Sequence, residues 1–308
     1  RVGIASASKW LSALTLARLV EAGALRWDST VGEFFPEAPA AAAPITLAQL
    51  FSHTSGIVAG EADCLSQRST TLQACALAIL AQPLAYAPGT AFAYGGNSMQ
   101  VAGALAERAT GQDWDTLFLT EVAQPLRLSH TDWSAGLSLP GYVRNPNPRI
   151  GGGARSTLDD YTRVLDMVLA GGDVAGDAFL SSQTLAVMAV DRTVGLPILD
   201  SPVTRDDQGY GLGQWVEARD AWGATTRVSS PGAFGFTPWV DWRQGNHGIV
   251  LVHGNGRAMR DDLTALQALC LRAMDPVDQM FDAPASPVLH PSRRARRPPA
   301  LDAAGPAH

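Results

Sequence analysis

The sequence predicts an α/β (α+β) protein in which an antiparallel sheet is flanked by helices and joined to a mostly helical subdomain. Two patterns carry this prediction. Apolar residues recur at helical spacing through the first two thirds of the chain, whereas short β-rich runs separated by turn residues follow after about residue 209. Of the 308 residues, 46% are hydrophobic and 17% are charged. This composition is typical of a compact, loop-rich enzyme and not of a disordered chain.

Several segments carry the local signals that begin and end helices. Thr46 with Gln49, and Thr70 with Gln73, have the spacing of a capping box, in which each residue's side chain satisfies a backbone group of the other. Glycine follows three of the apolar segments within two residues and predicts their C-terminal ends. The predicted helices cover residues 5–22, 46–51, 72–80, 98–109, 158–169 and 182–190.

The residues after 209 predict an antiparallel meander and one more helix. The expected strands are 210–217, 225–229, 235–241 and 248–252, with a turn at 244–246. Asp261 or Asp262 is expected to cap the last helix, which ends near Met274. We therefore expect one domain over residues 1–275, with a helical part at about 45–190 and strands at about 209–253. The remainder, 276–308, is rich in Pro, Ala and Arg and is expected to be a flexible tail.

Charge and hydropathy argue against two classes of partner. The formal net charge is −6 and no predicted helix carries a basic stripe, so nucleic acid is not an expected partner. No apolar run approaches the roughly 20 residues that cross a bilayer, so no membrane span is expected. The chain starts at Arg1 without Met or a signal-peptide pattern. We expect a removed leader and a periplasmic or extracellular location, with the cytoplasm as the alternative. Nothing in the sequence indicates the oligomeric state.

The basic residues are unevenly divided between the two types. Of 23 basic residues, 22 are Arg, and the only Lys is Lys9. Genomic base composition explains a replacement of Lys by Arg wherever only a positive charge is needed. A Lys that remains indicates a site where Arg fails, because Arg keeps its proton in proteins whereas Lys can act as a base. Chance is the alternative explanation for a single Lys.

Lys9 forms a Ser-x-x-Lys motif with Ser6. Side chains three residues apart lie on one face of a helix, so Lys9 is expected to hydrogen-bond Ser6. Burial beneath Trp10 and its apolar neighbours is expected to favour the neutral amine, which then takes the serine proton. The start of a helix also stabilises negative charge that develops on the serine oxygen or on an attacked carbonyl. The motif therefore predicts a nucleophilic serine; the alternative is that Ser6 only caps the helix.

Several further motifs, in a fixed order, resemble those of a known superfamily. They are Ile4–Lys9, Leu19–Gly23, Leu50–Ile57, Pro88–Thr90 leading to Tyr94, Gly151–Gly153 followed by Ser156 and Thr157, and Tyr210–Gly213. With these motifs, residues 1–274 resemble the serine β-lactamase and penicillin-binding-protein superfamily, in particular the branch of class C β-lactamases, D-Ala-D-Ala peptidases and related esterases. The resemblance implies a β-lactamase-like fold, here without its N-terminal strands, and an activity that requires no cofactor.

The resemblance also implies roles for individual residues. Ser6 attacks an acyl carbonyl, Lys9 assists proton transfer, and Tyr94 is a further acid or base. For Tyr94 the alternative is an ordinary half-buried tyrosine. The segment that corresponds to the Lys-Thr-Gly or His-x-Gly strand supplies the candidates for oxyanion and substrate binding, which are Ser230, Gly232 and Ala233. Backbone N–H groups of Ser6 and Ala233 are expected to form the oxyanion hole.

At two positions the chain departs from the family pattern. Gly96 stands where the Asn of a Tyr-x-Asn motif is expected, and Asn97 follows one position late. Asn97 is expected either to bind substrate or to cap the helix that begins at Ser98. Ser230 replaces the expected Lys or His and removes a cation that pairs with a substrate carboxylate. Arg227 lies at an odd offset from it along a strand, which puts it on the opposite face. These departures favour neutral esters over penicillins and muropeptides.

The cysteines and histidines add less. Cys64 and Cys75 are a disulfide candidate, which would stabilise the fold by roughly 3 kcal/mol and indicate an oxidising compartment; two unrelated thiols are the alternative. Cys270 is expected in the core. The sequence has no His-Glu-x-x-His motif, no paired-cysteine metal spacing and no Gly-x-Ser-x-Gly elbow. Neither a metal site nor a Ser-His-Asp triad is therefore expected.

The predicted function is a serine hydrolase that acts through a covalent acyl-enzyme on Ser6, with a small ester or amide as its substrate. Hydrolysis of a β-lactam or a D-Ala-D-Ala peptide is the alternative within the same chemistry. A different class of function is a catalytically silent homologue that binds a peptide or another partner, and the departures at Gly96 and Ser230 favour it.

Overall fold

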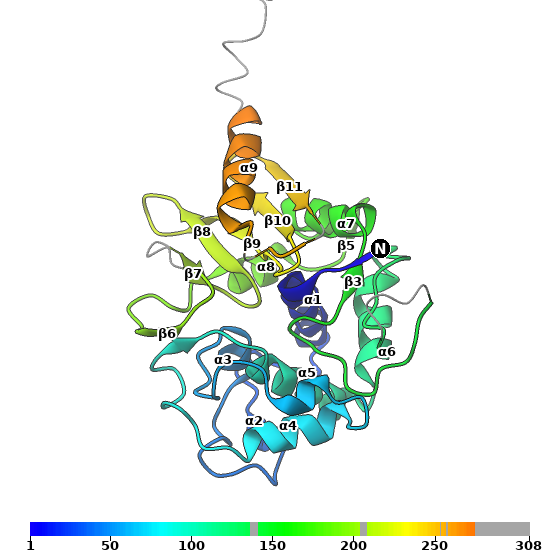
Figure 1. Cartoon of the computed structure of the whole chain (residues 1–308), viewed down its shortest axis with the longest axis vertical. Helices are drawn as coiled ribbons and strands as arrows, with labels where there is room; N and C mark the ends of the chain where they lie inside the picture. The colour runs from blue at the N-terminus through cyan, green and yellow to red at the C-terminus, as the bar shows by residue number, and fades with distance from the viewer. Residues whose placement is uncertain (136–140, 204–207, 253, 257, 275–308) are drawn as a thin grey trace, which may run out of the picture.

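The fold combines helices with one main antiparallel sheet, as the computed structural model of the chain shows (Figure 1). It describes residues 1–135, 141–203, 208–252, 254–256 and 258–274. The predicted α/β class is confirmed. The tail predicted at 276–308 lies outside the described residues, and the predicted domain boundaries stay a prediction.

The described helices occur at both ends of the chain and dominate its middle. They are α1 (Ser8–Glu21), α2 (Val31–Phe34), α3 (Leu47–Phe51), α4 (Leu72–Leu80), α5 (Asn97–Thr110), α6 (Trp114–Phe118), α7 (Leu158–Leu169), α8 (Ser182–Ala189) and α9 (Arg260–Ala273). Shorter helical turns are η1 (Ala5–Ala7), η2 (Asp63–Ser66) and η3 (Leu119–Ala123).

The main sheet has five antiparallel strands in the order β11-β10-β9-β8-β7. They are β7 (Gly209–Tyr210), β8 (Trp215–Arg219), β9 (Thr225–Ser229), β10 (Phe236–Asp241) and β11 (Asn246–Leu251). Three further pairs of short strands join distant segments. These pairs are β1 (Val2–Gly3) with β3 (Arg155–Ser156), β2 (Phe92–Ala93) with β6 (Ile198–Asp200), and β4 (Asp173–Val174) with β5 (Asp177–Ala178).

Helix α1 lies between the part that holds the sheet and the part formed by α2 to α5 (Figure 1). It contacts α5, α6 and α8. Trp10, Leu11 and Leu16, which point in different directions around the helix, are all fully buried. A helix that is apolar on every side is stable only when packed on every side. This position makes α1 the centre of the core and explains why a lysine on it is buried.

The two faces of the sheet meet different helices. Successive side chains of a strand point to opposite faces. Phe236 of β10 packs against Tyr161 of α7, with ring centroids 5.0 Å apart. On the other face, Glu217 of β8 accepts a hydrogen bond from Gln267 of α9. The space between that second face and α9 is where the cleft described below opens.

The structure corrects several local predictions. The segment expected as one strand at 210–217 forms two antiparallel strands, β7 and β8, joined by a turn. The first helix begins as the 3-10 turn η1, and α1 follows from Ser8. Helix α4 is capped by Thr71, whose side chain accepts from the N–H of Ala74, and not by Thr70. Helix α9 starts at Arg260 without a side-chain cap, so neither predicted aspartate caps it. The predicted turn at 244–246 is shorter, because β11 already begins at residue 246. Local spacing alone does not distinguish adjacent cap residues, since tertiary contacts shift the first turn.

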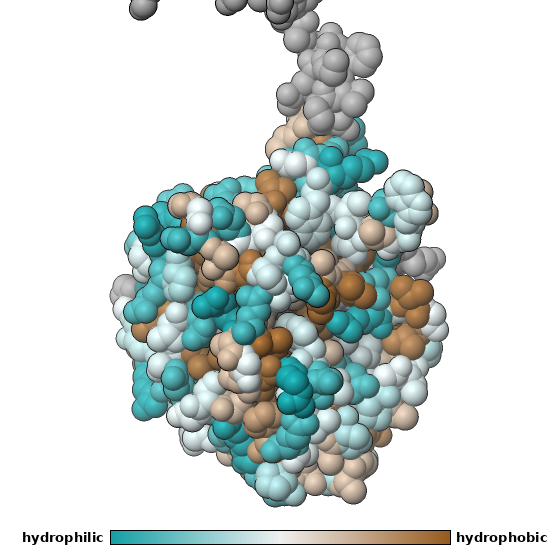
Figure 2. All heavy atoms as spheres, turned by 180° about the vertical axis from the view of Figure 1, so that it is seen from behind, coloured by the Kyte–Doolittle hydropathy of each residue, from teal (hydrophilic) through white to brown (hydrophobic). Residues whose placement is uncertain are grey.

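The surface carries apolar side chains in small patches among hydrophilic ones, as Figure 2 shows for the face opposite to that of Figure 1. Among the described residues, the helices are too short or too polar for any one of them to traverse a bilayer.

Candidate active site

Ser6 is presented by a tight turn at the start of the core. β1 pairs with β3, and the chain then reverses direction through Ala5, whose φ is 46°. A side chain other than glycine in this left-handed region costs about 1–3 kcal/mol and persists only where its surroundings hold it. Ser6 follows in the middle of η1, half-buried, at the entrance of α1. The turn thus places the hydroxyl at a helix N-terminus, where the helix dipole favours negative charge.

Lys9 lies directly beside Ser6, as the spacing predicts. Only 3% of the surface of Lys9 is exposed to solvent. The Nζ atom lies 3.2 Å from Ser6 Oγ and donates a 2.7 Å hydrogen bond to the carbonyl oxygen of Gly151. A Cβ atom at position 151 would come within 3.2 Å of Nζ, so glycine leaves the amine room. Lys9 is therefore a buried amine with fixed partners, aimed at the hydroxyl.

Tyr94 completes this group of side chains. Lys9 Nζ lies 4.7 Å from the centroid of the Tyr94 ring. The ring stacks on Trp215, at 5.4 Å between centroids and 21° between planes, and meets His53 at 4.5 Å. Both Ser6 and Tyr94 line the same cleft. The Tyr94 ring is thus held close to the Lys9 amine and lines the cleft together with Ser6.

His53 supports this aromatic group as a neutral ring. It is fully buried, and its burial, followed by the positive charge of Lys9, holds the pKa of His53 well below its ordinary value. Its φ of 58° marks a strained turn, and its carbonyl oxygen accepts from the Tyr86 hydroxyl. Among the described residues, the His53 ring contacts Tyr94 and Ser98 and not Ser6.

The segment 230–233 approaches the first turn of the chain. Ser230 Oγ donates a 3.1 Å hydrogen bond to the carbonyl oxygen of Ser6. A Cβ atom at Gly232 would lie only 2.0 Å from the carbonyl oxygen of Ile4, so no other residue fits at this crossing. Between described residues, the backbone N–H groups of Ser6 and Ala233 donate to no acceptor. Ser6 and Ala233 also line the same cleft.

Asn97 lies away from this cleft, which corrects both of its predicted roles. Its side-chain amide donates to the carbonyl oxygen of Val58, and its Oδ1 accepts from the N–H of Ala62. It is the first residue of α5 and does not cap that helix. It borders a different cavity, next to the Cys64 loop. Asn97 thus fastens the 58–62 loop to α5.

Gly96 lies against the same loop. A Cβ atom at this position would lie 2.6 Å from Glu61 Oε1. The Glu61 carboxylate is held there by an ion pair with Arg149. A Cβ atom at position 96 would therefore require the Glu61 side chain to shift.

Sequence reasoning missed most of the cleft wall. The cleft beside Ser6 has a volume of about 250 Å³ and extends between the sheet and α9. Thr237 Oγ1, on β10, is buried there and has no hydrogen-bond partner among the described residues. Arg260 of α9 also lines the cleft. No local motif marks these residues, because strand and helix meet only in the folded chain.

The Glu217 carboxylate also lines this wall, and it is paired with a cation. Its carboxylate accepts hydrogen bonds from Arg227 Nε at 3.2 Å and Gln267 Nε2 at 2.9 Å, and another from the Ser229 hydroxyl. Arg227 also pairs with Asp241. Arg227 is therefore held by two carboxylates, those of Glu217 and Asp241.

Cys64 and Cys75 form a disulfide, with Cα atoms 5.4 Å apart. It joins η2 to α4, next to the loop that Asn97 fastens. Cys270 of α9 is a free, half-buried thiol rather than a core residue. Among the described residues, no group of three or more His, Cys, Asp or Glu side chains is placed to hold a metal ion.

Comparison with known proteins places this geometry in context. The family model described as Beta-lactamase matches residues 1–271. Esterase EstB of Burkholderia gladioli is 32% identical over 141 residues, which cover 40% of this chain and 36% of that protein. Penicillin-binding protein 4 of Amycolatopsis lactamdurans is 33% identical over 135 residues, covering 40% of this chain and 33% of that protein. The chain thus spans about a third of the length of these curated relatives.

A solved structure extends the similarity over most of the fold. The crystal structure of a protein from Bacteroides dorei DSM 17855 superposes with a TM-score of 0.73 at 32% sequence identity. The superposition covers 83% of this chain and 78% of that one.

Proposed function

The chain belongs to the Beta-lactamase family, and from this premise we propose that it is a serine hydrolase that forms an acyl-enzyme on Ser6 and acts on small neutral esters or amides. One observation carries the proposal: a buried amine, Lys9 Nζ, lies 3.2 Å from the Ser6 hydroxyl in a cleft open to small molecules. Family membership supports hydrolase chemistry, and the roles below are proposed for this chain.

In the first step Ser6 Oγ attacks the acyl carbonyl while its proton passes to Lys9 Nζ, the proposed general base. The carbonyl oxygen becomes negative and is held by the N–H groups of Ser6 and Ala233. The bond to the leaving group then breaks, and the leaving group receives the proton from Lys9, either directly or by relay through the Tyr94 hydroxyl, which restores the base. Water, deprotonated by the same base, releases the acid and restores Ser6.

The charges around the cleft support a neutral substrate. Ser230 supplies a hydroxyl, already bonded to Ser6, where the resemblance leads us to expect a cation. Arg227 is occupied by two carboxylates, those of Glu217 and Asp241. A substrate carboxylate placed near Ser230 and Arg227 would meet no free cation there, because Arg227 is already paired, and its desolvation would go unrewarded.

One observation supports the second candidate, hydrolysis of a β-lactam or a D-Ala-D-Ala peptide. The cation Arg260 lines the cleft from α9 and carries no ion pair among the described residues. If it binds a substrate carboxylate, Arg260→Gln lowers kcat/KM for nitrocefin by about 10-fold or more while p-nitrophenyl acetate is little affected. A nitrocefin rate that is undetectable in the wild-type protein contradicts the second candidate.

The test of the main proposal is covalent labelling. A fluorophosphonate probe is expected to add one mass adduct to Ser6, and Ser6→Ala is expected to remove both the adduct and the turnover of p-nitrophenyl acetate. A folded wild-type sample without an adduct contradicts the proposal and favours the silent binding homologue. Circular dichroism of both proteins establishes that the comparison is made between folded chains.

The disulfide also bears on the cellular location of the protein. We propose a periplasmic or extracellular protein because the Cys64–Cys75 disulfide requires an oxidising compartment to form and persist. Cell fractionation tests this: recovery of the protein with both thiols free in the cytoplasm contradicts it.

A further inference from the structure

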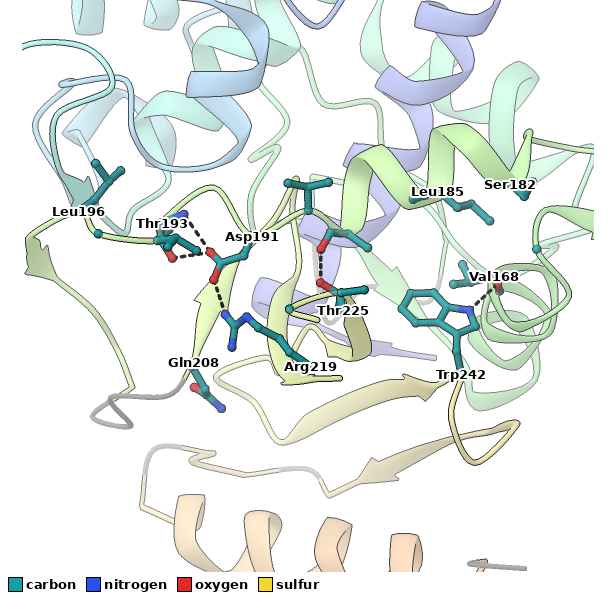
Figure 3. Close-up of a pocket in the computed structure, with 18 of the residues that line it drawn as sticks. Val168, Ser182, Leu185, Asp191, Thr193, Leu196, Gln208, Arg219, Thr225 and Trp242 are labelled. Carbon is teal, nitrogen blue, oxygen red and sulfur yellow. Dashed lines mark hydrogen bonds and ion pairs between the residues drawn. The ribbon is translucent and has the colours of Figure 1, made fainter. Parts of the chain in front are cut away.

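A second, larger cavity lies beside the sheet, away from Ser6 (Figure 3). Its volume is about 1120 Å³. Val168, Leu185 and Trp242 line one side of it, and Thr193, Leu196 and Gln208 line the other. Cavities of this size with mostly apolar walls are the usual form of small-molecule sites.

The walls of this cavity favour an uncharged, apolar occupant. In the only ion pair described among its lining residues, Asp191 and Arg219 neutralise each other's charge. Asp191 also accepts hydrogen bonds from the N–H and hydroxyl of Thr193 (Figure 3). The Trp242 indole N–H donates to the carbonyl oxygen of Val168, which leaves the face of the ring as apolar wall. The polar groups named here are therefore already engaged with each other.

The rim of the cavity exposes apolar side chains to water. Val190, Val194 and Ile198 line it and are 51%, 76% and 54% exposed. Single exposed apolar residues are ordinary, but a cluster around one hollow indicates a binding surface. A ligand with an apolar chain would bury these residues.

The cavity is linked to the Ser6 cleft through shared walls. Gln208 lines the large cavity and the Ser6 cleft, and it also lines a small space of about 20 Å³ between them. Trp215 and Val203 line both the cleft and this small space, whereas Thr193 and Ile198 line both the small space and the large cavity. Gln208 Oε1 is buried and has no partner among the described residues. Gln208 thus lies between the Ser6 cleft and the large cavity, and no hydrogen bond to its Oε1 atom from the described residues holds its side chain in place.

Building on the proposed function, we propose that the large cavity receives the apolar chain of the ester whose carbonyl Ser6 attacks, with Gln208 as the partition that the chain passes. The substrate class is therefore an ester with a medium-length or long apolar acyl or alkyl part. The cleft of about 250 Å³ holds the reacting group, and the cavity holds the chain. Each CH₂ group that is fully buried strengthens binding by about fourfold.

The experiment is a chain-length series of p-nitrophenyl esters from acetate to decanoate. The wild-type protein is expected to have a kcat/KM for octanoate at least about 10-fold above that for acetate, because several CH₂ groups become buried. Ala186→Trp fills the cavity from an exposed position on α8 and is expected to reduce this preference to within about threefold while acetate turnover stays unchanged. Val194→Asp, at the exposed rim, is expected to act in the same direction.

Ala81→Trp is the control, because Ala81 is also an exposed alanine but lies at the C-terminal cap of α4 and does not line the cavity. It is expected to retain the full octanoate preference. A flat chain-length profile in a wild-type protein that does hydrolyse acetate overturns the cavity proposal and leaves the hydrolase proposal intact. An octanoate preference that survives in Ala186→Trp overturns it as well.

A binding measurement separates the two proposals when no ester is hydrolysed. The ketones 2-decanone and 2-pentanone resemble esters but have no leaving group, and calorimetry with Ser6→Ala measures their affinity without catalysis. The longer ketone is expected to bind at least about 10-fold more tightly, and Ser6→Ala/Ala186→Trp to lose this difference. Equal affinity of both ketones for Ser6→Ala overturns the cavity proposal whatever the outcome of labelling.

Discussion

Lys9 combines burial with a position beside a hydroxyl, and both follow from where α1 lies in the core. The spacing of Ser6 and Lys9 is visible in the sequence because the two residues share one helical turn. Gly151, whose carbonyl oxygen binds the amine, is 142 residues away along the chain. Trp215, which stacks on Tyr94, is equally remote in sequence. Residue spacing therefore predicts the nucleophile and its neighbour but not the groups that hold them.

The role of the lysine has a direct test. Lys9→Arg keeps the positive charge but cannot give up its proton, so kcat/KM for p-nitrophenyl acetate is expected to fall by about 10²–10⁴-fold. Lys9→Met, which is closer in size to lysine, is expected to show the same loss and guards against a fold damaged by the larger arginine. Arg26→Lys, an exposed substitution, is the control and should leave the rate unchanged. A Lys9→Arg protein with full turnover contradicts the proposed base.

The elements show why helix ends are harder to predict than helix bodies. Helix α7 has the predicted bounds of 158–169, because its apolar periodicity and the glycines after it agree. At α4, two adjacent threonines both have a cap-forming side chain, and the structure uses Thr71. The side chain of Gln73, expected to complete the box with Thr70, donates instead to the carbonyl oxygen of Ala104 on α5. A contact between α4 and α5 thus occupies the Gln73 side chain that local spacing assigns to a capping box with Thr70.

The two threonines form a matched pair for measurement. Thr71→Ala removes the side chain that accepts from the N–H of Ala74 and is expected to lower the free energy of unfolding by about 1 kcal/mol. Thr70→Ala is expected to change it by less than about 0.5 kcal/mol. Urea denaturation of both variants compares them, and equal effects would argue against the cap that the structure assigns.

Helix α6 carries a carboxyl group with a shifted titration. Burial, with a smaller contribution from the negative charge of Asp113, raises the pKa of Asp115 from 3.8 to about 6, although the Tyr142 hydroxyl donates to it. The folded state therefore binds this proton more tightly than the unfolded chain. Between these two pKa values the folded state holds more protons, so this group makes the protein less stable as the pH rises.

Asp115→Asn removes that titration. In the wild-type protein the contribution of Asp115 lowers the free energy of unfolding as the pH rises from about 4 to about 6, and the variant is expected to lack this decline. Urea denaturation at several pH values between 4 and 7 measures the two slopes. The variant should equal the wild type near pH 4 and exceed it at pH 7; parallel curves would contradict the assignment.

The whole molecule is built around α1, and its overall class follows from patterns that need no tertiary information. Helical periodicity before residue 190 and short β-runs after residue 209 suffice to predict a mixed fold with an antiparallel sheet. The cleft and the large cavity were not predictable, because α9, the sheet and the 190–203 segment meet only after folding. Departures from the family pattern were visible, but the contact of Gly96 with the Glu61–Arg149 ion pair was not, because sequence spacing does not connect these residues.

The disulfide ties one part of this molecule covalently. Cys64→Ser/Cys75→Ser is expected to lower the free energy of unfolding by about 3 kcal/mol, because the unfolded chain regains the freedom of the closed loop. Thermal or urea denaturation measures the loss, and Cys270→Ser, which removes the free thiol instead, is the control. Unchanged stability in the double variant would mean that the bridge does not form in solution.

Because Gly232 crosses over the carbonyl oxygen of Ile4, the proposed activity should require the complete fold. The hydroxyl of Ser230 and the backbone of Ser6 that it binds are 224 positions apart, and they meet only when the sheet has closed over the first turn. A partly assembled intermediate would have Ser6 and Lys9 side by side but would lack the Ala233 N–H group that we propose holds the oxyanion. During refolding, the appearance of turnover should therefore coincide with the last structural phase and not with the early formation of helices.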